Sequence, residues 1–189
     1  LILPADTAWD PAIGPAKPLA KPKPESVSNT RISEIAELLR SNKNVVLLVG
    51  DHVLASEKLQ RISSSIAKQF GARFFAKWFG SRFDRGAGRP IIERLSYVVD
   101  KSLEMLKDTQ HVVLVGTAEP VGFFAYPNKP SLLAPPEAEM HVLAKVEDDV
   151  AAALEALAAE LGVTVIREPL QKTNALPCRP ESLNRTRSG

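Results

Sequence analysis

The sequence predicts an α/β fold: a doubly wound, Rossmann-like, mostly parallel sheet of five or six strands with helices on both faces. Two apolar runs, 45–49 and 111–115, contain no alternation with polar residues, and each is followed by a glycine. Such runs are typical of parallel strands buried on both faces. Segments with apolar residues at helical spacing lie between and around them. This alternation favours parallel strands joined by right-handed crossovers.

Helices are expected where apolar residues recur every three to four positions. The expected helices cover 30–41, 59–70, 103–106 and 146–161. Thr30 is a candidate N-cap for the first helix, and Asp100 could cap the third, because their side-chain oxygens can accept a hydrogen bond from a first-turn amide. Gly71 and Gly162 follow the second and fourth helices, where glycine suits the left-handed end position.

Strands are expected in the short apolar runs between these helices. The expected strands are 45–49, 72–76, 111–115, 131–134 and 140–143, with 163–166 as a further candidate at an edge. A turn at Pro135-Pro136 would join the strands 131–134 and 140–143, since proline favours turns. The segment 80–95 is expected to be a loop that leaves the sheet.

Three parts are expected along the chain. Residues 1–29 are the end of a preceding domain, with 1–4 as its last strand, followed by a linker rich in proline and lysine. Proline fixes φ and removes a donor, so this stretch favours a semi-extended linker. Residues 30–166 form the α/β domain, and the polar residues 167–189 are an exit linker expected to be disordered. Because the first residue is Leu1 and not Met, we expect a fragment of a longer protein.

Composition narrows the classes of function. The 189 residues carry a formal net charge of +2 and are 44% hydrophobic, which suits one globular domain. A nucleic-acid binder would usually be far more basic, so no nucleic-acid partner is expected. No signal segment and no apolar run of about 20 residues is present, so no membrane partner is expected. The single cysteine, Cys178, excludes an internal disulfide and favours the reducing cytoplasm.

A nucleotide site is one candidate at the ends of the two central strands. Gly50, Asp51 and Gly116 follow these strands, and ligands of open α/β sheets gather at the carboxyl ends of strands. Free amides at a helix N-terminus there would favour an anion. The alternative, which we favour, is that the glycines only make tight turns, because neither G-x-G-x-x-G nor the Walker A pattern is present.

An anion site is the second candidate, in the loop 80–95. Arginines and glycines are concentrated there: Arg82, Arg85, Arg89, Gly86 and Gly88. Guanidinium groups can bind a phosphate or carboxylate bidentately, and glycines let backbone amides approach it. The favoured alternative is a loop held by ion pairs to Asp84 and Glu93, or a subunit contact.

No catalytic or metal-binding motif stands out. The spacing of His52, His111 and His141 matches no motif such as H-E-x-x-H. We expect the histidines at turns or strand edges and predict no metal ligand and no catalytic residue. The aromatic residues of 123–126 could form an apolar wall, although core or interface positions are more usual for aromatic side chains.

Four segments carry a resemblance to a known family: 34–50 (EIAELLRSNKNVVLLVG), 85–97 (RGAGRPIIERLSY), 111–131 (HVVLVGTAEPVGFFAYPNKPS) and 147–162 (EDDVAAALEALAAELG). The middle two are the more specific. Together they resemble the central domain of thiamine-diphosphate-dependent enzymes, in the group of the acetolactate synthase large subunit and benzoylformate decarboxylase.

The resemblance implies a parent enzyme with three α/β domains. A pyrimidine-binding domain would precede this one and a diphosphate-binding domain would follow it, in a homo-oligomer. Thiamine diphosphate and Mg²⁺ would be bound by a glutamate of the first domain and a Gly-Asp-Gly…Asn motif of the third. Neither is present here, since Gly50-Asp51 continues into His52. In some relatives the central domain binds FAD or ADP.

The resemblance thus implies a transferase or lyase acting on pyruvate or another 2-oxo acid, in which this domain is a non-catalytic scaffold. The fragment alone is expected to be inactive. Two readings from other classes stay open. One is a stand-alone module that binds FAD, NAD or ADP at the Gly50 and Gly116 edge. The other is a purely structural or interaction domain.

Overall fold

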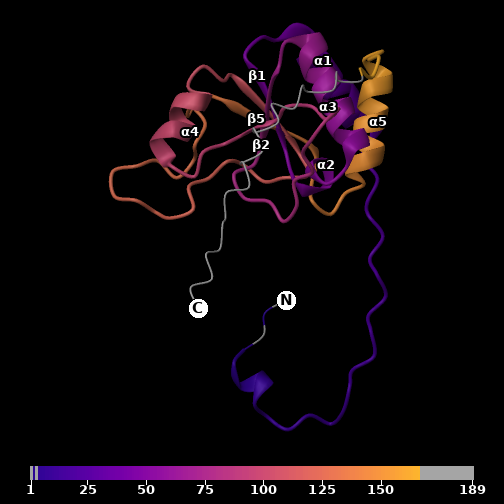
Figure 1. The fold of residues 1–189 in the computed structure, drawn as a ribbon, viewed down its shortest axis with the longest axis vertical. Helices are drawn as coiled ribbons and strands as arrows, with labels where there is room; N and C mark the ends of the chain where they lie inside the picture. Colours follow the sequence, from indigo (N-terminus) through magenta and orange to yellow (C-terminus); the bar gives the residue numbers. More distant parts are fainter. Residues whose placement is uncertain (1, 3, 167–189) are drawn as a thin grey trace, which may run out of the picture.

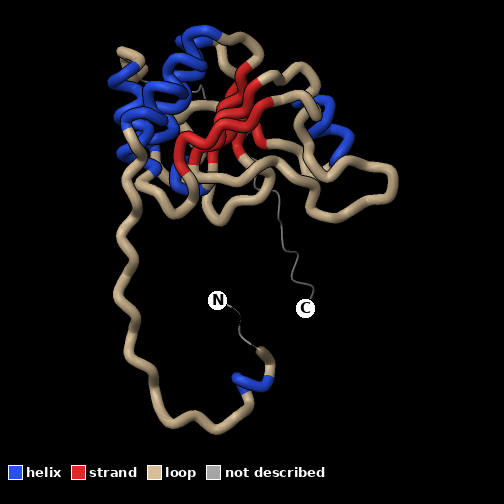
Figure 2. Tube along the Cα trace, turned by 180° about the vertical axis from the view of Figure 1, so that it is seen from behind, coloured by secondary structure: helices blue, strands red, loops and turns tan. Residues whose placement is uncertain are grey.

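The computed structural model describes residue 2 and residues 4–166. Its sheet is entirely parallel, with the strand order β3-β2-β1-β4-β5. Helices lie on either side of the sheet (Figures 1 and 2). The strands are β1 (Val45–Val49), β2 (Arg73–Ala76), β3 (Glu93–Arg94), β4 (His111–Val115) and β5 (Glu139–Ala144). The predicted fold class is confirmed, with five strands in the sheet.

β1 lies at the centre of the sheet and pairs in parallel with β2 on one side and β4 on the other. Its five apolar residues are all buried. Alternate residues of the strand therefore contribute to two separate cores, with Leu47 in one and Leu48 in the other. This explains why its sequence shows no alternation between apolar and polar residues.

Helices cover the two faces of the sheet unequally. Three longer helices lie on one face: α1 (Asn29–Ser41), α3 (Glu57–Phe70) and α5 (Val150–Glu160). The short α2 (Asp51–Leu54) packs on the same side. Only α4 (Val99–Leu106), among the described helices, lies on the other face, where loops complete the cover (Figure 1).

The predicted strand 131–134 is wrong. Only an isolated antiparallel bridge joins Val121 to Leu132, and the amide of Leu133 donates to the carbonyl of Pro120 at 2.8 Å. Leu133 and Ala134 are nevertheless buried against the core beside α4. Their apolar character therefore reflects loop packing, and the two prolines that follow cannot donate to a strand ladder.

The N-terminal ends of three helices differ from the prediction. The N-cap of α1 is Ser28, not Thr30, and its side chain accepts a hydrogen bond from the amide of Arg31. Asp149 caps α5, so that helix begins four residues after Val146. Asp100 is not a cap, because it lies inside α4, whose N-cap is Val98. The predicted end of α3 is confirmed, since Gly71 is left-handed with φ 68°.

Two short elements within the α/β domain were not predicted. α2 follows β1 directly, and β3 is a two-residue strand inside the predicted loop 80–95. Both are too short to show a hydrophobic period. β3 forms because the backbone of 93–94 completes the edge beside β2, with Phe75 opposite Glu93.

The segments that flank the sheet and helices also differ from expectation. Residues Asp6–Ala8 form a 3-10 helix, and residues 2 and 4 are in no strand. Residues 163–166 form no strand; the amide of Ile166 instead donates to Ser65 of α3 at 3.0 Å. The predicted exit linker 167–189 lies outside the described residues. In the described part of the chain no helix is both long and apolar enough to cross a bilayer.

Removing one central side chain tests this packing. Leu154 of α5 is 0% exposed and belongs to the core shared with α1 and α3. We expect Leu154→Ala to lower the free energy of unfolding by about 2–5 kcal/mol, because it removes buried methyl groups and leaves a cavity. Urea denaturation followed by circular dichroism measures this. The control is Ile91→Ala at an 83% exposed position, which should change stability by no more than about 0.5 kcal/mol.

Candidate functional site

The carboxyl edge of the sheet holds a shallow hollow of about 300 Å³. It lies where ligands of open α/β sheets usually bind. It is lined by Leu48, Lys77, Trp78, Phe79, Leu95, Thr117, Ala118, Glu119, Pro120 and Val146. These residues come from the ends of β1 and β2 and from the loops after β3, β4 and β5, so the wall is part charged and part aromatic.

Gly50 and Gly116 lie at this edge and touch each other. A Cβ atom on Gly50 would lie 1.8 Å from the carbonyl oxygen of Gly116. The amide of Gly50 donates to Val115 at 2.9 Å, and that of Gly116 donates to Ala144 at 2.8 Å. Gly116 also has φ +62°, where a side chain is strained. Both glycines therefore have a steric reason to be glycine that requires no ligand.

Asp51 lies beside Gly50 and forms an ion pair with Lys77 at the end of β2. Its Oδ2 accepts from the Lys77 ammonium at 3.0 Å. Burial alone would raise the pKa of the Asp51 carboxyl, but Lys77 and Ser81 outweigh burial and hold that pKa below its usual value. Asp51 is therefore a carboxylate at neutral pH, and its charge is already matched by a cation.

Aromatic rings gather next to the hollow. We call Trp78, Phe79, Tyr97, Phe123, Phe124 and Tyr126 the aromatic cluster. Trp78 contacts Phe79 and Phe123 with ring centroids 4.2 and 5.3 Å apart. Phe79 is 56% exposed, and Phe123 and Phe124 are each 55% exposed. Contiguous exposed rings of this kind are typical of a surface that packs against protein or ligand.

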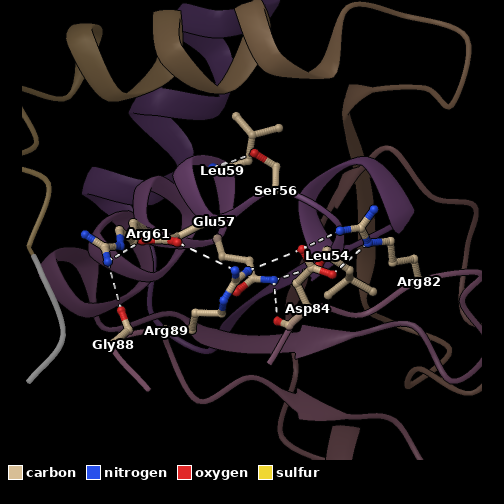
Figure 3. A network of polar contacts seen from close by, with 10 residues as sticks. Leu54, Ser56, Glu57, Leu59, Arg61, Arg82, Asp84, Gly88 and Arg89 are labelled. Atoms are coloured by element: carbon tan, nitrogen blue, oxygen red, sulfur yellow. Dashed lines mark hydrogen bonds and ion pairs between the residues drawn. The ribbon is translucent and has the colours of Figure 1, made fainter. Parts of the chain in front are cut away.

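The arginine-rich loop is held by ion pairs (Figure 3). Arg82 makes a two-pronged contact with Asp84, its Nε lying 2.7 Å from Oδ1. Arg89 reaches the same carboxylate at 3.4 Å and the carboxylate of Glu57 in α3 at 3.6 Å. Asp84 thus pairs with the loop arginines, as expected for a loop held by ion pairs. Glu57 takes the place expected for Glu93, which is exposed in β3.

The remaining groups of this loop also have local contacts. The guanidinium carbon of Arg85 lies 4.2 Å from the centre of the Phe83 ring. Gly86 and Gly88 have positive φ and form a turn in which the amide of Arg89 donates to Gly86 at 3.2 Å. The carbonyl of Gly88 accepts from Arg61 at 3.0 Å. The loop is therefore fastened to α3 (Figure 3).

One group of side chains at the opposite, amino edge was missed by sequence reasoning. His111 opens β4, as expected, and His141 lies inside β5. With Glu139 they bring three potential ligand atoms within 4.8 Å of one another. Burial, and then the neighbouring His111, lower the pKa of His141, while Glu139 raises it. The Glu-x-His spacing on a strand was the available signal, since residues two apart share a face.

Comparison with known proteins gives a sequence relative and several structural neighbours. No family model matches the chain. The chain is 36% identical over 161 residues to a Mycobacterium tuberculosis protein named "Putative acetolactate synthase large subunit IlvX". The match covers 85% of this chain and 30% of that protein. The chain therefore spans about a third of the length of this relative.

Solved structures share the fold at lower identity. A protein from Mycobacterium smegmatis described as "a putative thiamin diphosphate-dependent enzyme" aligns with a TM-score of 0.55 and 23% identity, over 84% of this chain and 33% of that one. The benzoylformate decarboxylase of Polynucleobacter necessarius aligns with a TM-score of 0.54 and 18% identity, over 91% of this chain and 36% of that one. The chain therefore shares the fold of a domain of these enzymes. The resemblance stated from the sequence is confirmed for the fold.

Among the described residues, the pair Gly50-Asp51 does not fit thiamine diphosphate or its Mg²⁺. The one Gly-Asp pair, Gly50-Asp51, has its glycine packed against the backbone of Gly116 and its carboxylate paired with Lys77. An Asp already bound to an ammonium is a poor ligand for Mg²⁺, which takes free carboxylates and phosphates. No step of a thiamine reaction is therefore assigned to this domain.

The Asp51–Lys77 pair predicts a pH-dependent contribution to stability. A carboxyl whose folded-state pKa lies below its unfolded value of about 3.9 stabilises the fold above that pH, and this is lost as pH falls through the folded-state pKa. Both side chains are about a third exposed. We therefore expect Asp51→Asn to cost only about 1 kcal/mol near neutral pH.

The measurement is urea denaturation near neutral pH and at about pH 3, where the difference between wild type and Asp51→Asn should shrink. Glu93→Gln, at an exposed position, is the control and should follow wild type. A difference for Asp51→Asn that stays constant with pH would contradict this account.

Proposed function

We propose that the chain is the central, non-catalytic domain of a cytoplasmic enzyme similar to acetolactate synthase, a transferase or lyase. The observation that carries the proposal is the 36% identity to a protein named for that activity, over 85% of this chain but only 30% of the relative. Such a match is what one domain of a longer enzyme would give. Pyruvate or another 2-oxo acid would be the substrate.

The parent enzyme would bind thiamine diphosphate and Mg²⁺ in two further domains, a pyrimidine-binding and a diphosphate-binding domain. The cofactor supplies the chemistry that breaks or forms a carbon–carbon bond next to a carbonyl. Residues 1–29 and 167–189 would be the passages to these domains, and 30–166 the domain between them. Two observations support a scaffold role: Asp51 and the loop arginines are engaged internally, and no catalytic motif is present in the sequence.

The aromatic cluster supports a packing role for this domain in a homo-oligomeric parent. Phe79 and Phe123 are more than half exposed and touch with ring centroids 5.6 Å apart. Burying such rings on assembly removes apolar area from water, at about 25 cal/mol per Å².

A nucleotide such as FAD, NAD or ADP is the alternative occupant of the carboxyl edge. The hollow of about 300 Å³ has both Lys77 and Trp78 in its lining. A cation and an aromatic face are suited to a phosphate and an adenine ring. Gly50, Asp51 and Gly116 would form the floor of this site, and Arg85 and Arg89 its more distant rim.

The first experiment measures pyruvate consumption with thiamine diphosphate and Mg²⁺. We expect none from the 189-residue chain and cofactor-dependent consumption from the protein expressed with its flanking coding sequence. Turnover by the chain alone would overturn the non-catalytic role. A longer protein that folds but shows no cofactor-dependent activity on 2-oxo acids would overturn the enzyme proposal.

The packing role is tested in that longer protein by replacing Phe79 and Phe123 with serine. We expect the oligomer to dissociate at concentrations at least about tenfold higher than for wild type, because interface aromatics carry much of the binding energy. Sedimentation velocity measures this. Ile91→Ser, which removes an exposed apolar side chain outside the aromatic cluster, should leave assembly unchanged. Equal effects of the two variants would contradict the packing role.

The nucleotide alternative is tested by thermal unfolding of the chain with FAD, NAD or ADP. A ligand that binds only the folded state raises the melting temperature in proportion to the logarithm of its concentration above the Kd. If the alternative holds, Lys77→Gln should abolish this shift and Lys68→Gln, on α3, should retain it. No shift with any of the three ligands would remove the alternative.

A further inference from the structure

Two histidines and a glutamate share one face of the sheet at its amino edge. His111 in β4 lies directly opposite Glu139 in β5, and Val113 lies opposite His141. Side chains two apart on a strand point to the same face, so the three groups form one cluster. Val113 and Leu143 continue this face into the core beneath α1 and α5. The cluster therefore rests on a packed base, unlike ligands on a loop.

The three ligand atoms are spaced as a metal ion requires. Nδ1 of His111 lies 3.2 Å from Nε2 of His141. Oε2 of Glu139 lies 3.6 Å from the first nitrogen and 3.5 Å from the second. Tetrahedral Zn²⁺ with bonds of about 2.0–2.1 Å holds its ligand atoms about 3.3 Å apart. Each side of the observed triangle is within a few tenths of an ångström of that value.

The surroundings suit a site with three protein ligands and one open position. The side chains of His111 and His141 are only 15% and 24% exposed, whereas that of Glu139 is 68% exposed. The histidines are thus held by packing, and the carboxylate is free to adjust its distance. His141 also lines an open hollow of about 630 Å³ that runs along α1, which leaves room for a water molecule as fourth ligand.

We propose that His111, Glu139 and His141 bind a divalent transition-metal ion, for which Zn²⁺ is the best match. Two imidazoles and one carboxylate are a ligand set for Zn²⁺, whereas Mg²⁺ prefers oxygen ligands alone. The ion would join β5, at the edge of the sheet, to β4. This inference does not depend on the proposed function, because it concerns the opposite edge of the sheet from the aromatic cluster.

The test uses the 189-residue chain with Cys178→Ser, so that no thiolate competes for the metal, after removal of metal with a chelator. Calorimetric titration with ZnCl₂ should show one Zn²⁺ per chain, and ZnCl₂ should raise the melting temperature with concentration. CoCl₂ should produce the visible absorption of tetrahedral Co²⁺. MgCl₂ should produce neither binding heat nor stabilisation.

Single variants then assign the ligands. We expect His111→Gln, His141→Gln and Glu139→Gln each to weaken Zn²⁺ binding by at least about tenfold, since even the loss of groups that only orient ligands costs that much. His52→Gln, the remaining histidine, is the matched control and should bind Zn²⁺ as the parent does. Glu139→Gln changes an exposed side chain, so it remains a test if a histidine variant fails to fold.

Two results would overturn the proposal. One is a Kd for Zn²⁺ weaker than about 1 mM, which corresponds to only about 4 kcal/mol of binding free energy. The other is an unchanged affinity in His141→Gln and Glu139→Gln, which would show that any bound Zn²⁺ is held by other groups.

Discussion

The burial of β1 between two parallel neighbours constrains the rest of the structure, because its residues can then take no polar side chain on either face. β2 and β4 supply its hydrogen bonds, and helices or loops must cover both sides. Where β1 ends, Gly50 meets the carbonyl of Gly116 so closely that no side chain fits between them. The ends of β1 and β4 are therefore in direct backbone contact. A ligand at this edge would be recognised by the side chains around that contact.

The unequal cover of the two faces is the second organising feature. Three helices pack closely on one face, while α4 and irregular segments cover the other. Loops leave more apolar surface exposed than packed helices do, and the aromatic cluster lies on this side. A domain built in this way has one self-contained face and one face suited to a neighbour. That asymmetry agrees with a match that covers only part of a longer relative.

The sequence was sufficient to predict those elements whose structure depends on a pattern of neighbouring residues. The strands at 45–49 and 111–115 and the left-handed glycine after α3 were predicted because continuous apolar runs and glycine ends have local causes. The strand at 131–134 was wrong because burial beneath a loop produces the same apolar run as a strand. β3 was missed because its existence depends on its neighbour β2 and not on its own two residues.

Residue pairings across the fold were harder to foresee. Asp84 lies within the arginine loop and was predicted as a partner, whereas Glu57 comes from α3 and was not. His111 and His141 are 30 positions apart and meet only through the register of β4 and β5. Knowing that two strands are neighbours does not fix which residues stand opposite one another, and that register decides whether a ligand set exists.

The attachment of the proline-rich segment gives the domain a defined direction. Glu25 forms a parallel bridge with Asp148, and its carbonyl accepts from the amide of Asp149 at 2.8 Å. Asp149 also caps α5, which begins at the carboxyl edge after β5. The segment is thus clamped next to the edge that carries the aromatic cluster. A partner domain joined through it would be tethered from the carboxyl edge of the sheet, so the tether would start beside the aromatic cluster.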